Sequence, residues 1–239
     1  MIFGAILAGG TGTRMNIVDM PKQYLPLGGG KPVIIHTLEK FLLCSRIDMI
    51  YIGAHPDWVS YTQAQLERYV PSQIERIKVI EGGVDRTGTI INIIEAIEAD
   101  HGSSPDHYII THDAVRPFVS LRIIQDNIDA VLEYKACDTV IPATDTIVVS
   151  TDGQVISDIP QRRFMYQGQT PQSFQLDLLK GLYASMSQEE RAILTDACKI
   201  CHIRDIPVHL VTGDVVNLKL TTLGDYKVSQ AMIESGASD

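Results

Sequence analysis

Residues 2–15 read IFGAILAGGTGTRM, an apolar run that passes directly into a glycine-rich turn. An apolar run that ends in glycines predicts a buried strand followed by a tight loop. Gly9, Gly10 and Gly12 let backbone amides approach a ligand without an intervening Cβ, and successive N–H groups that point one way attract an anion. Arg14 and Lys22 add positive charge beside this loop. The stretch therefore predicts an α/β protein that binds a triphosphate after its first strand.

Two well-known phosphate loops do not fit this spacing. A Walker-type loop requires lysine directly after its last glycine and then Ser or Thr, whereas Gly30-Lys31 is followed by Pro32. A dinucleotide-binding fingerprint that began at Gly10 would require Gly or Ala at position 15, which is Met15. A glycine-rich turn without a ligand is the remaining alternative, and the nearby positive charges argue against it.

Composition limits the classes of function. The chain has 239 residues and a net charge of −9 without a basic run, which argues against a nucleic-acid surface. The first apolar stretch stops after about seven residues, too short for a membrane helix or a signal segment. We expect a cytoplasmic protein that folds as one domain over residues 1–239.

The cysteines suit a reducing compartment. Cys198 and Cys201 form a C-x-x-C pair with His202 and His209 nearby, but one pair without a second is weak support for a zinc site. The same spacing places both thiols on one face of a helix. We interpret them, with Cys44 and Cys137, as buried structural thiols.

Strand and helix patterns alternate along most of the chain. Apolar runs predict strands at 2–8, 49–54, 77–80, 107–111 and 139–141, separated by helical patterns at 32–42, 57–70, 90–97 and 120–131. The last part predicts helices at 176–186 and 192–200, strands at 208–211 and 217–220, and a final helix that opens with Thr222 and Asp225. This alternation predicts a Rossmann-like, mainly parallel sheet with helices on both faces.

The alternation of strand and helix patterns stops after Asp138. The segments 146–150 and 154–158 flank Thr151-Asp152-Gly153, a hairpin turn signal, and 163–169 alternates like a strand. This pattern predicts a β-hairpin arm at about 142–170. Because an isolated hairpin is only marginally stable, we expect the arm to pack on a second subunit in a homodimer.

Chemically capable residues follow several predicted strands. Gly82-Gly83 with Asp85 and Arg86, then 112–117 with Asp113 and Arg116, then 143–146 with Asp145 and Thr146, each begin where a strand ends. Each group alone has an ordinary structural explanation as a cap, a turn or a solvated surface. In an open α/β sheet, however, ligands bind at the carboxyl ends of the strands. Their common position therefore favours a binding site.

The motifs together resemble one family, the cytidylyltransferases of polyol phosphates. The matching residues are Leu7-Ala8-Gly9-Gly10-x-Gly12-x-Arg14-Met15, Pro21-Lys22-Gln23-Tyr24, Gly82-Gly83-x-Asp85-Arg86, His112-Asp113-Ala114-Val115-Arg116-Pro117, Thr170-Pro171-Gln172, Thr195-Asp196 and Asn217-Leu218-Lys219. The family includes the enzymes for methylerythritol phosphate, in isoprenoid synthesis, and for ribitol 5-phosphate, in wall teichoic acid and capsule synthesis. The opening and the segment 166–172 resemble the ribitol branch more closely.

The resemblance implies a nucleotidyltransferase fold, Mg²⁺ as cofactor, and CTP and a polyol phosphate as substrates. Asp113 would bind the metal, and Arg162, in the predicted arm, would serve either its own site or the partner subunit's. Arg14, Lys22 and Lys219 would be catalytic; Leu7, Ala8, Gly9, Gly10, Gly12, Thr13, Gly82, Arg86, Thr89 and Asp113 would bind CTP; and Arg116, Asp145, Thr146, Arg162, Thr170 and Thr195 would bind the acceptor. Whether a second carboxylate such as Asp214 helps hold the metal stays open.

Two other classes remain as alternatives. A non-catalytic nucleotide-binding module could retain the fold, although binding alone would tolerate loss of Lys22 or Lys219. A dehydrogenase would bind NADH, and Met15 argues against it.

Overall fold

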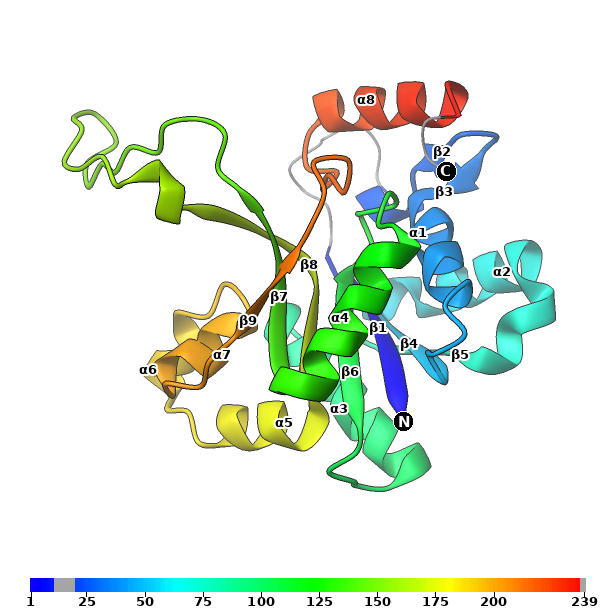
Figure 1. Ribbon diagram of the computed structural model, residues 1–239. Helices are drawn as coiled ribbons and strands as arrows, with labels where there is room; N and C mark the ends of the chain where they lie inside the picture. The colour runs from blue at the N-terminus through cyan, green and yellow to red at the C-terminus, as the bar shows by residue number, and fades with distance from the viewer. Residues whose placement is uncertain (11–19, 237–239) are drawn as a thin grey trace.

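The computed structural model describes residues 1–10 and 20–236. Within these residues one seven-stranded sheet forms the centre of the molecule (Figure 1). From edge to edge its strands are β5 (Ile77–Glu81), β4 (Met49–Ala54), β1 (Ile2–Ala8), β6 (Tyr108–Asp113), β8 (Tyr166–Gln175), β7 (Ala136–Pro142) and β9 (His209–Thr212). Only β8 runs antiparallel to its neighbours β6 and β7, so the expected mainly parallel sheet is confirmed.

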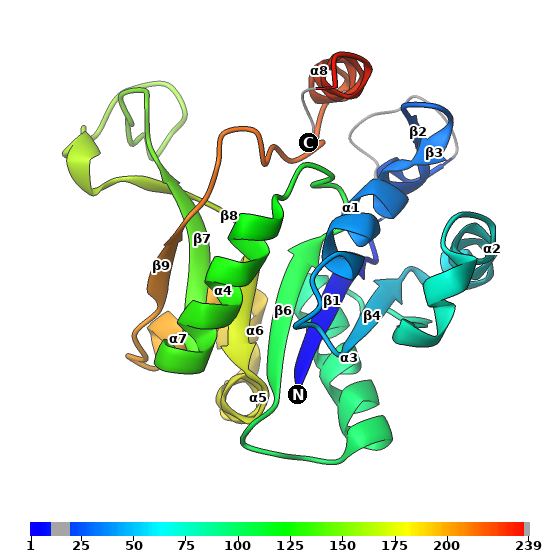
Figure 2. The same cartoon turned by 45° about the vertical axis from the view of Figure 1, so that its right-hand side comes forward.

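Helices cover both faces of the sheet, as the alternation predicts (Figures 1 and 2). On one face lie α1 (Val33–Leu42), α2 (Val59–Tyr69) and α4 (Leu121–Tyr134), and on the other lie α3 (Arg86–His101), α5 (Leu176–Ala184) and α7 (Cys198–Ile203). The short helix α6 (Gln188–Ala192) precedes α7, and α8 (Leu223–Glu234) lies above the strand ends beside the small hairpin of β2 (Pro26–Leu27) and β3 (Lys31–Pro32).

The first strand shows why a continuous apolar run is needed. Phe3 and Ala5 belong to the core under α3 and α5, whereas Ile6 and Ala8 belong to the core under α1 and α4. A strand buried on both faces requires apolar residues at every position. The glycine-rich loop then begins where β1 leaves the sheet.

Two predicted elements near the end of the chain differ from the structure. The predicted helix 192–200 is divided between α6 and α7, because the carboxylate of Asp196 accepts the backbone N–H of Cys198 and starts a new helix there. Residues 217–220 form a connecting segment, not a strand. Its backbone instead hydrogen-bonds to Val115 and Arg116.

The predicted arm is present as a projection but not as two paired strands. It leaves the sheet between β7 and β8 (Figure 1, upper left). At its base Pro142 pairs with Tyr166 and the Ala143 N–H donates to the Met165 carbonyl, and further out the described sides meet at an isolated bridge between Val149 and Asp158. The turn itself forms as predicted, because Asp152 accepts the backbone N–H groups of Gln154 and Val155. An isolated hairpin is only marginally stable, which accounts for the short pairing beyond the base of the arm.

Two general features complete the description. In the part of the chain that the structure describes, no helix is long and apolar enough to cross a membrane.

The thiols of Cys44, Cys137 and Cys201 are buried, Cys198 is partly buried, and all four are free. Burial raises the pKa of Cys137 to about 12 and that of Cys201 to about 11.

Candidate active site

The strongest charge cluster of the described residues lies at the carboxyl end of β6, around Asp113. Its Oδ1 accepts the Nε–H of Arg86 at 3.2 Å, and its Oδ2 lies 2.9 Å from Nζ of Lys219 and 3.6 Å from Nε of Arg116. Three cations around one carboxylate leave a net positive charge. The cluster is therefore suited to bind an anion.

Each member of the cluster is placed by a different element. Asp113 is the last residue of β6 and pairs with Leu7 of β1. Arg86 is the first residue of α3, whose N-cap Asp85 accepts the Gly88 N–H at 2.7 Å. Lys219 lies in the segment that follows β9. The cluster thus joins three segments that are far apart in the sequence.

Hydrogen bonds also fix the segment that carries Lys219. The guanidinium of Arg116 donates to the backbone carbonyl of Asn217 at 2.8 Å, and the Asn217 amide donates to the carbonyl of Thr170 at 2.8 Å. The N–H of Leu220 donates to the carbonyl of Val115. Arg116 therefore holds Lys219 in place as well as adding charge.

The electrostatics of the cluster favour an ionised carboxylate and an incoming anion. Burial raises the pKa of Asp113, but Arg86 and Lys219 outweigh burial and hold this pKa well below its usual range. Burial lowers the pKa of Arg116, and Asp113 opposes that shift. Among the described residues, both Nη atoms of Arg86 are buried without a hydrogen-bond partner. Since buried polar groups normally have partners, these donors are suited to an anionic ligand.

Gln23 holds the start of the glycine loop through hydrogen bonds. The sequence motif alone assigns no role to this residue. Its Nε2 donates to the backbone carbonyls of Ala8 at 2.8 Å and Gly10 at 2.9 Å. Gln23 lies in the 3-10 helix Lys22–Tyr24, so the same element brings Lys22 to the loop. The predicted ligands Gly12, Thr13 and Arg14 lie outside the described residues.

The predicted nucleotide residues on α3 meet the start of the loop. A Cβ added to Gly9 would lie 3.1 Å from Oγ1 of Thr89, and one added to Gly82 would lie 3.0 Å from the same atom. The Thr89 hydroxyl accepts the Gly83 N–H at 3.0 Å and donates to the Asp85 carbonyl at 2.9 Å. Thr89 therefore holds the Gly82-Gly83 turn in place, while its hydroxyl is already bonded to the backbone.

The predicted acceptor residues are divided among three places. Thr170 is buried beside the cluster, where its hydroxyl bonds to His112 Nδ1 at 2.9 Å and accepts the Asp113 N–H at 3.2 Å. By contrast, Asp145, Thr146 and Arg162 belong to the arm. There Arg162 donates to the Thr144 carbonyl, and no described bond or ion pair joins these residues to the cluster. Thr195 is exposed between α6 and α7.

The donor set fits Mg²⁺ only in company with a nucleotide. No group of three or more His, Cys, Asp or Glu side chains able to hold a metal occurs within the described ranges, and Asp113 is surrounded by cations. Mg²⁺ commonly binds to one or two carboxylates together with substrate phosphates, and Asp113 fits that arrangement. Asp214 uses one carboxylate oxygen, Oδ1, to accept the Val216 N–H at 2.9 Å, and a second metal ligand at this position stays a prediction.

Comparison with known proteins identifies the family. The family model described as 2-C-methyl-D-erythritol 4-phosphate cytidylyltransferase, IspD, matches residues 2–235. The chain belongs to this family. As a member of it, the protein is a nucleotidyltransferase enzyme of the cytidylyltransferase class, as the motifs predict.

Individual IspD-family relatives cover nearly the whole chain. A ribitol-5-phosphate cytidylyltransferase of Streptococcus pneumoniae serotype 2 (strain D39 / NCTC 7466) is 52% identical over 234 residues, 98% of this chain and 99% of the relative. A 4-diphosphocytidyl-2C-methyl-D-erythritol synthase of Anaerococcus prevotii has a TM-score of 0.79 at 27% identity and covers 98% and 96% of the two chains. The Francisella tularensis IspD structure gives a TM-score of 0.78 at 24% identity, over 97% and 99% of the chains.

Proposed function

We propose that this protein transfers CMP from CTP to D-ribitol 5-phosphate and releases pyrophosphate. The product, CDP-ribitol, would supply wall teichoic acid or capsule synthesis in the cytoplasm. The observation that carries the choice of acceptor is the 52% identity to a ribitol-5-phosphate cytidylyltransferase over almost the full length of both chains. The Anaerococcus synthase named for methylerythritol is 27% identical.

The reaction is a displacement at phosphorus. A phosphate oxygen of the acceptor attacks the α-phosphorus of CTP, the new P–O bond forms, and the bond to the β-phosphate oxygen breaks with its electron pair leaving on pyrophosphate. Both reactants are anions, so the barrier contains charge repulsion as well as the cost of alignment. No side-chain nucleophile is needed.

The cationic residues supply what this displacement requires. Lys219 and Arg86, beside Asp113, are placed to neutralise phosphate charge at the end of β6. The glycine loop, with Arg14 and Lys22, would hold the triphosphate. Mg²⁺, held by Asp113 and the nucleotide phosphates, would neutralise charge that develops on the phosphates.

The arm supports a homodimer in which one subunit completes the acceptor site of the other. Its apolar side chains are largely exposed, with Val155 at 66%, Ile156 at 55%, Ile159 at 57% and Phe164 at 62%. Contiguous exposed apolar residues of this kind favour a protein contact. A partner's arm would also bring Asp145, Thr146 and Arg162 to a site with which they make no described bond in their own chain.

Pyrophosphate release from CTP and Mg²⁺ tests the reaction. We expect release that depends on ribitol 5-phosphate, with CDP-ribitol as the second product. Protein that binds CTP but releases no pyrophosphate with ribitol 5-phosphate or methylerythritol 4-phosphate would instead be a nucleotide-binding module.

A further inference from the structure

One buried amide links two carboxylates next to the proposed acceptor site. Gln172 lies on β8 two residues beyond Thr170, and its side chain is buried. Its Nε2 donates to Oδ1 of Asp138 at 3.1 Å and to Oδ2 of Asp196 at 2.6 Å. Asp138 lies directly opposite on β7. Both amide hydrogens of Gln172 are therefore used by carboxylates.

The Gln172–Asp196 bond ties a connecting segment to the sheet. The second oxygen of Asp196 accepts the Cys198 N–H at 2.8 Å, at the start of α7. Asp196 directly follows Thr195, which lies between α6 and α7. The bond thus fixes the position of Thr195 relative to Thr170, the two threonines that the family resemblance assigns to the acceptor site.

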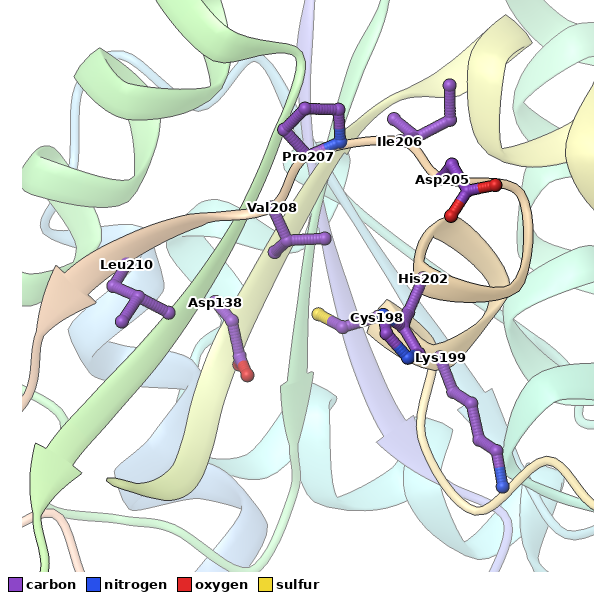
Figure 3. A pocket seen from close by; sticks show the side chains of 9 residues that line it. All are labelled: Asp138, Cys198, Lys199, His202, Asp205, Ile206, Pro207, Val208 and Leu210. Atoms are coloured by element: carbon purple, nitrogen blue, oxygen red, sulfur yellow. The ribbon is translucent and has the colours of Figure 1, made fainter. Parts of the chain in front are cut away.

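Asp138, on β7, lies next to a gap between the sheet and α7. It lines a cavity of about 630 Å³ between β7, β9 and α7, into which Asp138 and Cys198 point from opposite sides (Figure 3). The titratable groups that line this cavity with Asp138 are Cys198, Lys199, His202 and Asp205. The charges of Asp196, Arg86 and Arg116 also act on Asp138.

Together, burial and the surrounding charges favour the neutral, protonated form of Asp138. Burial, reinforced by the charge of Asp196, outweighs the Gln172 hydrogen bond and the two arginines and raises the pKa of Asp138 to about 7. Among the described residues the buried Oε1 of Gln172 has no hydrogen-bond partner, and a protonated Asp138 carries an O–H donor next to the same side chain.

We propose that Asp138 and Gln172 are positioning residues, which hold the Thr195 segment at the acceptor site through Asp196 while Asp138 is neutral. When Asp138 ionises, two like charges lie on either side of one amide, and the bond to Asp196 is weakened. The added charge also repels the phosphate of the acceptor. This inference rests on the proposed function, and it makes acceptor affinity fall as the pH rises through about 7.

The variant Asp138→Asn tests this directly, because asparagine keeps the accepting oxygen and is neutral at every pH. The acceptor phosphate itself titrates near pH 6, so the readout is the ratio of wild-type to variant KM for ribitol 5-phosphate. We expect this ratio to rise roughly threefold to tenfold between about pH 6 and pH 8.5, the scale of one added charge near the site. The KM for CTP should show no such rise.

Two further variants keep the test decisive. Gln172→Leu should raise the KM for the acceptor at all pH values, and Asp205→Asn, in the same cavity but not bonded to Gln172, should behave as wild type. A ratio that does not change with pH, or a Gln172→Leu enzyme with an unchanged acceptor KM, would overturn the inference. Absence of CMP transfer by the wild type at every pH would instead overturn the proposed function.

Discussion

At the scale of single residues, we assign the chemistry to Asp113 and its three cationic neighbours. The meeting of Arg86, Asp113 and Arg116 could be predicted, because they follow parallel strands whose ends reach one edge of the sheet. From the sequence, Lys219 is assigned to this site by the family resemblance alone. The roles of Gln23 and Gln172 could not be predicted in this way. Both act through bonds to partners that only the folded chain brings close, the carbonyls of Ala8 and Gly10 in one case and two carboxylates in the other.

The hydroxyls of Thr89 and Thr170 show a related limit. The family resemblance predicts a ligand contact for each, and both hydroxyls are bonded within the protein, to backbone around Gly83 and to His112 and Asp113. Each hydroxyl therefore supports the local fold, which sequence spacing does not predict, while the direct ligand contact stays a prediction.

Lys219→Ala should lower turnover by about a hundredfold or more, the scale for losing one donor that acts in the transition state. Lys22→Ala should have an effect of the same order for the same reason. Steady-state rates with saturating CTP measure this. Lys227→Ala, an exposed lysine on α8, is the control and should retain full activity. Near-normal turnover by folded Lys219→Ala protein would remove Lys219 from the mechanism.

Asp113→Asn should weaken the dependence of the rate on Mg²⁺, because an amide is a poorer ligand than a carboxylate. Since the neighbouring cations hold the pKa of Asp113 well below its usual range, the wild-type carboxylate stays charged above about pH 5, and its metal affinity should not change from there to pH 8. A magnesium titration at two pH values measures both effects. A titration identical to that of the wild type would exclude Asp113 as the ligand.

The start of α3 shows how an element positions the site. Gly83 packs directly on the first turn of this helix, where an added Cβ would lie 2.4 Å from the carbonyl carbon of Gly88. The sequence predicts the glycine turn but not this contact, which depends on the angle between α3 and the sheet. Likewise, the bridge Val149–Asp158 replaces a predicted strand pair, because turn residues specify a turn without supplying a surface for the strands.

Gly83→Ala should displace the first turn of α3, with Arg86 and Thr89, and cost about 1–3 kcal/mol of stability as an overpacked contact. We expect a higher KM for CTP and a lower midpoint in urea unfolding. Gly181→Ala, in α5, is the matched control, because its Cβ would meet nothing within 4 Å. Equal CTP affinity in Gly83→Ala and wild type would contradict this account of the turn.

At the scale of the whole molecule, the mainly parallel sheet was predictable from the alternation of strand and helix patterns. The order of β8 and β7 was not, because β8 inserts antiparallel between β6 and β7 after the long excursion of the arm. The arm leaves apolar side chains, among them Val155 and Phe164, exposed in the single chain. Their exposure is the reason to expect a second subunit.

Replacing Ile159 and Phe164 together by Asp should therefore produce a monomer, because two charges would have to be buried in the contact. Sedimentation velocity measures the change, and acceptor turnover should fall with it. Leu43→Asp, which alters an exposed apolar residue between α1 and β4, should leave the assembly unchanged. A wild-type protein that sediments as a monomer at assay concentrations would contradict the proposed dimer.

The central claim is CMP transfer to ribitol 5-phosphate, and direct competition between acceptors tests it most sharply. Equimolar ribitol 5-phosphate and methylerythritol 4-phosphate are mixed with limiting CTP, Mg²⁺ and enzyme, and the cytidine diphosphate products are quantified by phosphorus NMR. The account predicts that CDP-ribitol dominates and that Lys219→Ala forms neither product at a comparable rate. Predominant formation of the methylerythritol product would contradict the choice of acceptor.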